Sequence, residues 1–195
     1  LPYDQRVTPV GRGEVITTEG NAAAMFYGYK TDGVFSTTAE ANASGLQTRG
    51  QDGSLMPFRA GDVRFIDTNN DGIIDDNDRQ IIGNPNPGVF GMFSMNASYK
   101  RFTFDASFTF SAGNDIYNYQ RHQLESMSSF DNQLVSVNNR WRNEGQVTDM
   151  PRMSFNDPYG NSRFSDRWIE DGSYLRLKAL NITYNIPING RMVKD

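Results

Sequence analysis

A run of twelve residues carries oxygen-bearing side chains at the spacing of a calcium-binding loop. Counting from Asp67, side-chain oxygens fall at positions 1, 3, 5, 9 and 12, and Gly72 takes position 6, where the chain must turn with a positive φ. Ca²⁺ is a hard cation that takes roughly six to eight oxygen ligands. We predict a Ca²⁺ site with these ligands, Ile73 acting through its carbonyl: Asp67, Asn69, Asp71, Ile73, Asp75 and Asp78.

The last predicted ligand differs from the EF-hand pattern, because Asp78 stands where the longer Glu is usual. Loops of this form resemble those of dockerin modules and of many extracellular proteins. We expect the apolar Ile74 to anchor the loop to a neighbouring core, so that the ion rigidifies the loop and does not switch it. The alternative is a solvated Asn/Asp-rich turn without an ion.

Residues for other chemistry are sparse. His122 is the only histidine and there is no cysteine, so a zinc site or a His-based triad has no ligand set. We expect His122 to be a polar loop residue. Neither Glu125 with Asp131 nor Glu170 with Asp171 lies in a glycosidase-type motif. We therefore do not expect an enzyme.

The composition leaves two classes open. The chain of 195 residues is 37% hydrophobic, with a mean hydropathy of −0.63. These values suit a soluble β protein, and they equally suit a membrane barrel, whose lipid-facing residues alternate with wet ones. The net charge of −4 argues against nucleic acid. Without an initiator methionine or a signal peptide, we expect a piece of a longer protein or a processed chain.

Period-2 alternation predicts antiparallel strands. Apolar residues alternate with small polar ones over 93–99 and 102–110, on either side of Lys100-Arg101, which indicates a hairpin. A last strand is predicted over 174–186, and the apolar phase changes within it, which indicates a β-bulge. We expect an all-β chain.

The remaining segments carry weaker signals. Residues 25–29 read as a strand that restarts near 34–35, and residues 1–20, 36–60 and 143–166 read as irregular. One helical turn is predicted near Thr38–Ala43, and a short helix over Phe130–Trp141.

Five phrases, in order along the chain, resemble the SusC/RagA family of TonB-dependent outer-membrane transporters. They are Tyr27–Phe35 (YGYKTDGVF), Gly61–Pro87 (GDVRFIDTNNDG through IIGNPNP), Gly113–Asn118 (GNDIYN), Ser165–Lys178 (SDRWIEDGSYLRLK) and Asn181–Pro187. The resemblance covers about residues 27–187 and is specific because the phrases keep the family's order.

This resemblance implies antiparallel strands of a partial transmembrane β-barrel, near its C-terminal end, with long extracellular loops and one EF-hand/dockerin-like calcium loop. It implies four to six strands of about ten residues. The whole of 1–195 would be a fragment of the barrel domain, with the calcium-loop segment at 61–88, and with the plug domain and the closing strands absent.

The family also implies a function and partners. Members import glycan or peptide fragments across the outer membrane of Gram-negative, Bacteroidetes-like bacteria. Their partners are a SusD-like surface lipoprotein, TonB (through N-terminal regions) and an oligosaccharide or peptide ligand. The alternative is a secreted or surface calcium-binding β module that binds glycan or a partner protein through the exposed aromatics Tyr117, Tyr119, Trp141 and Trp168.

Overall fold

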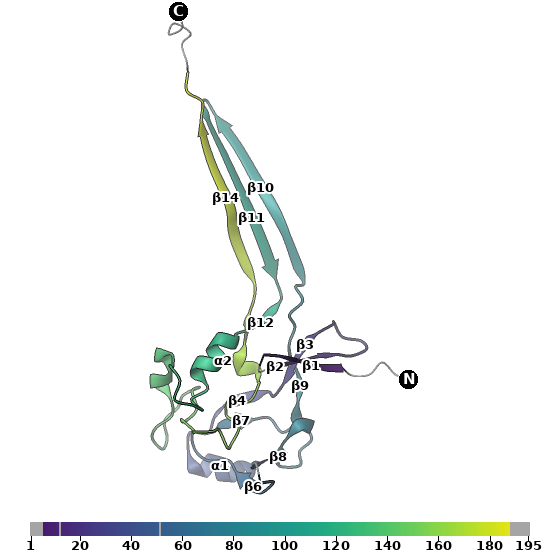
Figure 1. Ribbon diagram of the computed structural model, residues 1–195, viewed down its shortest axis with the longest axis vertical. Coiled ribbons are helices and arrows are strands. Elements are labelled where there is room, and N and C mark those ends of the chain that lie inside the picture. Colours follow the sequence, from purple (N-terminus) through teal and green to yellow (C-terminus); the bar gives the residue numbers. More distant parts are fainter. Residues whose placement is uncertain (1–5, 12, 51, 188–195) are drawn as a thin grey trace, which may run out of the picture. The chain divides into compact units, whose positions relative to one another are not determined.

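The computed structural model describes residues 6–11, 13–50 and 52–187, and the chain divides into two compact units (Figure 1). Unit 1 comprises 1–86 and 115–171, and unit 2 comprises 87–114 and 172–195. The described part is mostly strands with a few short helices, as the all-β prediction requires. None of its helices has the length and apolar character needed to cross a membrane.

Unit 2 is an antiparallel sheet of three 11-residue strands in the order β10-β11-β14 (Figure 1). The strands are β10 (Val89–Tyr99), β11 (Phe102–Ala112) and β14 (Tyr174–Tyr184). The predicted hairpin is confirmed, since Tyr99 pairs with Phe102 across the turn and the register continues to Val89 and Ala112. Lys100 in this turn has a φ of 55°, a conformation that costs a non-glycine residue some strain.

The bulge predicted in the last strand is also confirmed. Ser107 pairs with Ala179 and Phe108 pairs with Leu177, so Lys178 is the extra residue. The bulge turns Leu175 and Leu177 onto the face that carries Leu180 and Ile182, because one unpaired residue reverses the side-chain phase of a strand.

Unit 1 contains four small sheets, ordered β1-β2-β3-β9, β4-β7, β6-β5-β8 and β12-β13. Their strands are β1 (Arg6–Val10), β2 (Gly13–Thr17), β3 (Met25–Gly28), β4 (Thr31–Val34), β5 (Gln47–Arg49), β6 (Leu55–Pro57), β7 (Val63–Phe65), β8 (Ile73–Ile74), β9 (Gln80–Gly83), β12 (Asp115–Tyr117) and β13 (Ile169–Asp171). These strands are two to five residues long. The described residues therefore hold three long strands. The resemblance implied four to six strands of that length, and this prediction was wrong.

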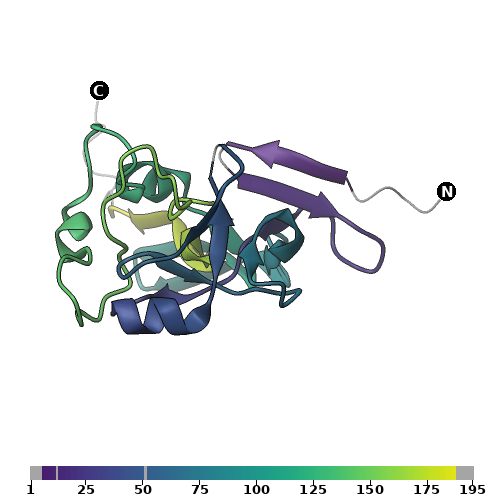
Figure 2. The same ribbon diagram turned by 90° about the horizontal axis from the view of Figure 1, so that it is seen from below.

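The irregular start predicted for residues 1–20 was also wrong for its described part. β1 and β2 form a hairpin there, visible as the purple arrows of Figure 2. Pro9 did not prevent the strand, because β1 is an edge strand and needs no donor from that position on its outer side. Likewise, β5 and β6 lie within 36–60, which we had expected to be loop.

The helices of unit 1 are short: α1 (Thr38–Ser44), α2 (Tyr119–Glu125) and the 3-10 turns η1 (Asp76–Asp78), η2 (Val135–Asn139) and η3 (Asp166–Trp168). The turn predicted near Thr38–Ala43 is α1, whose N-cap is Thr37, accepting from the Glu40 amide. The helix predicted over 130–141 shrinks to η2, and α2 was not predicted. The apolar spacing of 134–141 lacked a capping residue to begin a longer helix.

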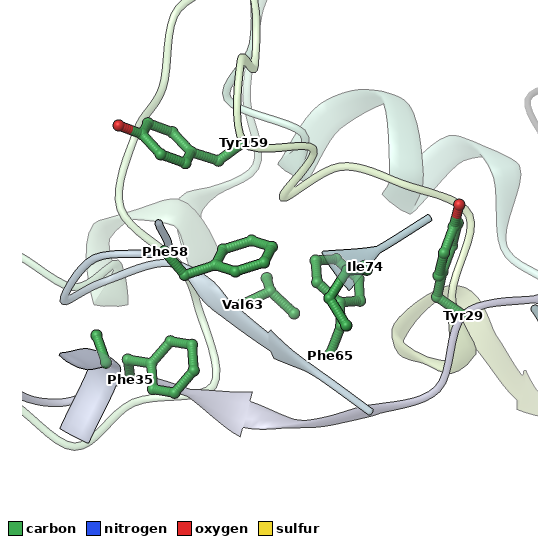
Figure 3. Close-up of a cluster of buried hydrophobic side chains, with 8 residues drawn as sticks. Tyr29, Phe35, Phe58, Val63, Phe65, Ile74 and Tyr159 are labelled. Atoms are coloured by element: carbon green, nitrogen blue, oxygen red, sulfur yellow. The ribbon is translucent and has the colours of Figure 1, made fainter. Parts of the chain in front are cut away.

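A cluster of aromatic and aliphatic side chains forms the main core of unit 1 (Figure 3). Its members come from β7, β8, α1 and several loops: Tyr29, Phe35, Ala41, Phe58, Val63, Phe65, Ile74 and Tyr159. Each large side chain buried here contributes about 2–3 kcal/mol. A second cluster joins Phe26, Phe164 and Trp168. These two clusters fix the positions of the loop segments of unit 1, which make few backbone hydrogen bonds of their own.

Candidate functional site

The segment 67–78 makes a tight turn around Gly72. Gly72 has a φ of 77°, as predicted from its position in the loop. The two residues that follow it form β8, which pairs in parallel with β5. Ile74 is 1% exposed and lies in the main core, so the predicted anchor is confirmed (Figure 3). The tertiary structure thus fixes the second half of the turn.

The first three predicted ligands bind the amides of the turn. Asp67 accepts from Asn70 N at 2.7 Å and from Gly72 N at 2.8 Å. Asn69 accepts from Asp71 N at 3.0 Å, and its amide group donates to the Asp71 carboxylate at 2.9 Å. The other Asp71 oxygen accepts from Ile73 N at 2.8 Å. These hydrogen bonds satisfy backbone N–H groups that a tight turn cannot pair with backbone carbonyls.

The last two predicted side-chain ligands close the loop. Asp78 is fully buried, and it accepts from Thr68 N at 2.8 Å and from Asp75 N at 2.9 Å. Asp75 caps η1 by accepting from Asn77 N at 2.9 Å. Within the described residues, no three Asp, Glu or His side chains converge as a metal-binding group. The loop therefore holds its carboxylates on backbone amides, with Asn69 and Asp71 exposed.

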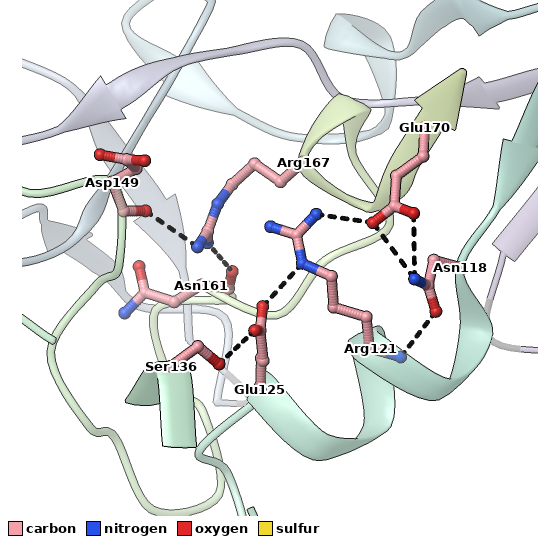
Figure 4. A network of polar contacts seen from close by, with 8 residues as sticks. All are labelled: Asn118, Arg121, Glu125, Ser136, Asp149, Asn161, Arg167 and Glu170. Carbon is pink, nitrogen blue, oxygen red and sulfur yellow. Dashed lines mark hydrogen bonds and ion pairs between the residues drawn. The ribbon is translucent and has the colours of Figure 1, made fainter. Parts of the chain in front are cut away.

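A second polar site joins the segments that carry two of the five sequence phrases (Figure 4). β12 pairs with β13, and Asn118, which caps α2, donates to both Glu170 oxygens at 3.1 Å. Arg121 bridges the carboxylates of Glu125 at 2.8 Å and Glu170 at 3.0 Å. The hydrogen bonds from Arg121 and Asn118 lower the pKa of Glu170 below its usual value. No sequence spacing links Asn118 to Glu170, so only the fold brings them together.

Arg167 is the most buried cation of this site (Figure 4). Burial lowers its pKa to about 10, and the nearby Arg121 adds to the effect. Its guanidinium donates to the Asp149 carbonyl at 3.0 Å and lies 5.2 Å from the Trp168 ring centroid. This arrangement satisfies a desolvated cation with a carbonyl and an aromatic face.

His122 was wrongly predicted to be a polar loop residue. It lies in α2, is 1% exposed and stacks on Trp168 with ring centroids 4.5 Å apart. Its Nε2 donates to the Ser162 carbonyl at 2.7 Å, and its Nδ1 lies 2.6 Å from the Tyr117 hydroxyl. Trp168 is likewise buried, which removes it from the aromatics expected on an exposed binding surface. The histidine is thus a packing residue of unit 1.

The Gly61-Asp62 segment is held by a buried clamp, by which we mean Asp62 and the residues that donate hydrogen bonds to its carboxylate, Arg152, Asn161 and Arg59. Asp62 is fully buried and accepts two bonds from Arg152, at 2.8 and 3.1 Å. It also accepts from Arg59 N at 2.9 Å and from the Asn161 amide at 2.9 Å. Asn161 in turn accepts from Val63 N at 2.8 Å. Sequence reasoning placed Asp62 only in a phrase of resemblance and missed this contact, which spans ninety positions of the chain.

The sheet of unit 2 exposes one apolar face. The register aligns Phe93 with Phe108 and Leu177, and the next rows along the same face hold Met95, Ala106, Leu180 and then Ala97, Phe104, Ile182. Phe93 and Phe108 stack with ring centroids 4.9 Å apart. Except for the short Ala106 and the half-covered Phe108, these apolar side chains are exposed. The opposite face carries hydroxyl and amide pairs such as Ser94 with Ser107, at 3.0 Å, and Asn96 with Asp105.

Comparison with known proteins gives a consistent result, although no family model matches the chain. It is 30% identical to the TonB-dependent receptor P26 of Formosa agariphila over 181 residues, which are 92% of this chain and 17% of that one. It is 33% identical to TonB-dependent receptor P3 of the same organism over 172 residues, 88% of this chain and 16% of that one. The chain thus spans about a sixth of the length of these relatives.

Solved structures agree in fold. The RagAB peptide transporter matches with a TM-score of 0.69 and 19% identity, over 98% of this chain and 19% of that chain. The RagAB peptide importer in the 'open-open' state matches with a TM-score of 0.64 and 22% identity, over 95% of this chain and 18% of that chain. Relatives and fold together identify the chain as a SusC/RagA-like segment of the TonB-dependent receptor kind.

Proposed function

We propose that the chain is part of a TonB-dependent transporter that imports peptide or glycan fragments across the outer membrane of a Gram-negative, Bacteroidetes-like bacterium. The observation that carries this proposal is the sheet of unit 2. Its strands have 11 residues each, and a tilted membrane-spanning β-strand needs about 9–11. One face is apolar and the other polar, which is the alternation of a barrel wall between lipid and a wet interior.

The same sheet argues against the alternative of a secreted calcium-binding module. On the apolar face, Met95, Leu177 and Ile182 are 50–68% exposed, whereas a soluble antiparallel sheet buries one face in its core. Lipid is the solvent in which such a face is stable. An open sheet edge is not stable there, so β10 and β14 must pair with further strands of a barrel near its C-terminal end.

Unit 1 fits the role of extracellular loops. In barrels of this class the turns at the periplasmic end are short and the loops at the outer end are long. The β10–β11 turn has two residues, whereas residues 113–173 separate β11 from β14. The clamp at Asp62 and the network at Arg121 give these long connections a fixed structure that a ligand or a capping lipoprotein can contact.

The proposed partners follow from the relatives. TonB-dependent receptors take their name from TonB, and the structural neighbours are described as a peptide importer and a peptide transporter. We propose a SusD-like surface lipoprotein and a peptide or oligosaccharide ligand on the outer side, with TonB engaged by regions outside this chain.

We also propose that the loop at 67–78 binds a structural Ca²⁺ ion. The donor set supports this, because it consists of carboxylate, amide and carbonyl oxygens around a turn at Gly72. Binding would exchange some of the hydrogen bonds that Asn69 and Asp71 make to the turn for ligation. Because Ile74 already anchors the loop to the core, a bound ion would have the structural role of stiffening the loop.

Uptake by cells tests the transport proposal. A strain that lacks the receptor should lose uptake of its peptide or oligosaccharide, and a plasmid copy of the receptor should restore it only when TonB is present. Fractionation should recover the receptor in the outer membrane. Recovery in the soluble fraction, or uptake that persists without TonB, contradicts the proposal.

A further inference from the structure

The end of the unit 2 sheet at the β10–β11 turn combines aromatic and basic side chains. Tyr99 pairs with Phe102, and Phe102 pairs with Tyr184, so three aromatic residues form one row across the three strands. The Phe102 and Tyr184 rings lie 4.8 Å apart. Lys100 and Arg101 form the turn itself, and Arg101 is held by Asn185 N, which donates to its carbonyl at 2.8 Å.

These five residues line an open groove of about 750 Å³: Tyr99, Lys100, Arg101, Phe102 and Tyr184. All five are exposed. The Lys100 ammonium lies 5.2 Å from the Tyr99 ring centroid, so the cation sits over the aromatic row. An anionic headgroup in this groove would contact both the Lys100 charge and the aromatic row.

The two cations have no anionic partner in the part of unit 2 that the structure describes. Over 87–114 and 172–187 there are four basic side chains and one acidic side chain, Asp105. Asp105 lies on the polar face, bonded to Asn96, and no ion pair forms with Lys100 or Arg101 among the described residues. The chain as a whole is net negative. The positive charge at this turn is therefore local and can attract an external anion.

We infer that this groove binds the headgroup phosphate of an anionic phospholipid, an inference that rests on the proposed membrane-spanning role of unit 2. The aromatic row lies on the apolar face, directly after the row Ala97, Phe104, Ile182. Tyr and Trp rings favour the headgroup level of a bilayer, and basic residues beside them attract anionic lipids. The acyl chains then cover the apolar rows that continue from the groove. A free anion would leave those rows uncovered.

The test uses the full receptor, purified from membranes, and native mass spectrometry with phosphatidylglycerol and phosphatidylcholine of the same acyl chains. The variant is the double change Lys100→Asn, Arg101→Gln, since Asn tolerates the positive φ of position 100. The matched control is Arg176→Gln, Lys178→Gln, which removes two charges from β14 away from the turn.

The unchanged receptor should prefer phosphatidylglycerol. Each cation near an anionic lipid surface is worth about a factor of five, so the turn variant should lose about thirty-fold of this preference. Tyr184→Ala should weaken both lipids alike, because it removes ring contact and no charge. The inference is overturned if the turn variant keeps the preference, if the control loses as much, or if inorganic phosphate alone displaces the lipid. A receptor that is not recovered in the membrane fraction refutes the proposed function instead.

Discussion

Asp62→Ala is expected to open unit 1 locally more than any other carboxylate change discussed for this chain. The carboxylate is fully buried and accepts four hydrogen bonds, two of them from one guanidinium. Burial alone would lower the pKa of Arg152, but the bonds and charge of Asp62 outweigh it and raise that pKa. Alanine would leave Arg152 and Asn161 facing an apolar gap without an acceptor.

The magnitude follows from the burial of each partner. Removing one partner of a buried ion pair costs about 3–5 kcal/mol. The Arg152 side chain is 26% exposed, so water can recover part of its solvation, and the lower end, about 3 kcal/mol, applies. Asp62→Asn keeps the shape of the side chain but turns an acceptor into a donor opposite Arg152. We expect this change to cost about 2 kcal/mol of local stability.

Hydrogen–deuterium exchange of the purified receptor measures this opening in peptides that cover 58–66. A loss of about 3 kcal/mol corresponds to about a hundred-fold faster exchange where exchange follows the opening equilibrium. The matched control is Asp32→Ala, which removes an exposed Asp–Arg pair of the same 2.8 Å length. Such pairs contribute at most about 1 kcal/mol, or about five-fold. Equal effects of the two changes would refute the assignment of Asp62 as a buried clamp.

Three further changes test the remaining sites. Asp67→Ala with Asp71→Ala should abolish Ca²⁺ binding in calorimetric titration of the receptor, whereas Asp52→Ala should not; retained affinity would reject the ligand set. Glu170 has a pKa below its usual 4.5, so its stabilising contribution is complete above that value and is lost as pH falls through the lower folded pKa. The opening of α2, measured by amide exchange corrected for the intrinsic pH dependence of the exchange rate, should therefore increase on acidification, and Glu170→Gln should remove that increase; identical corrected profiles would contradict it. Gly28→Ala should destabilise β3 by about 1–3 kcal/mol, because its Cβ would lie 2.4 Å from the Phe164 carbonyl oxygen, and a melting temperature equal to that of the unchanged receptor would rule this out.

The strands of unit 2 were predictable because their signal is local. Alternation over 93–99 and 102–110 specifies a hairpin with a two-residue turn, and the phase change after Leu177 specifies the bulge at Lys178. Gly72 was predictable for the same reason, since a positive φ restricts the residue type at one position. Whether the loop binds Ca²⁺ stays a prediction.

The helices and polar contacts of unit 1 were less predictable, because their stabilisation comes from distant segments. α2 is seven residues long and is held by the Asn118 cap and by the packing of His122 on Trp168. Helices this short have little stability of their own. A single polar histidine in a polar sequence gave no sign that it would be buried.

The sequence by itself determined the alternating strands, their turn and bulge, the order of the five phrases and the oxygen spacing of the loop at 67–78, since each depends on neighbouring residues. Only the tertiary structure decided that β14 pairs with β11, that Asn118 meets Glu170, and that Asp62 meets Arg152. Those pairs lie fifty to ninety positions apart, so no local pattern could reveal them. The buried Asp62 carboxylate and the unpaired edge of β11 each need a partner, and the fold supplies it from a distant segment.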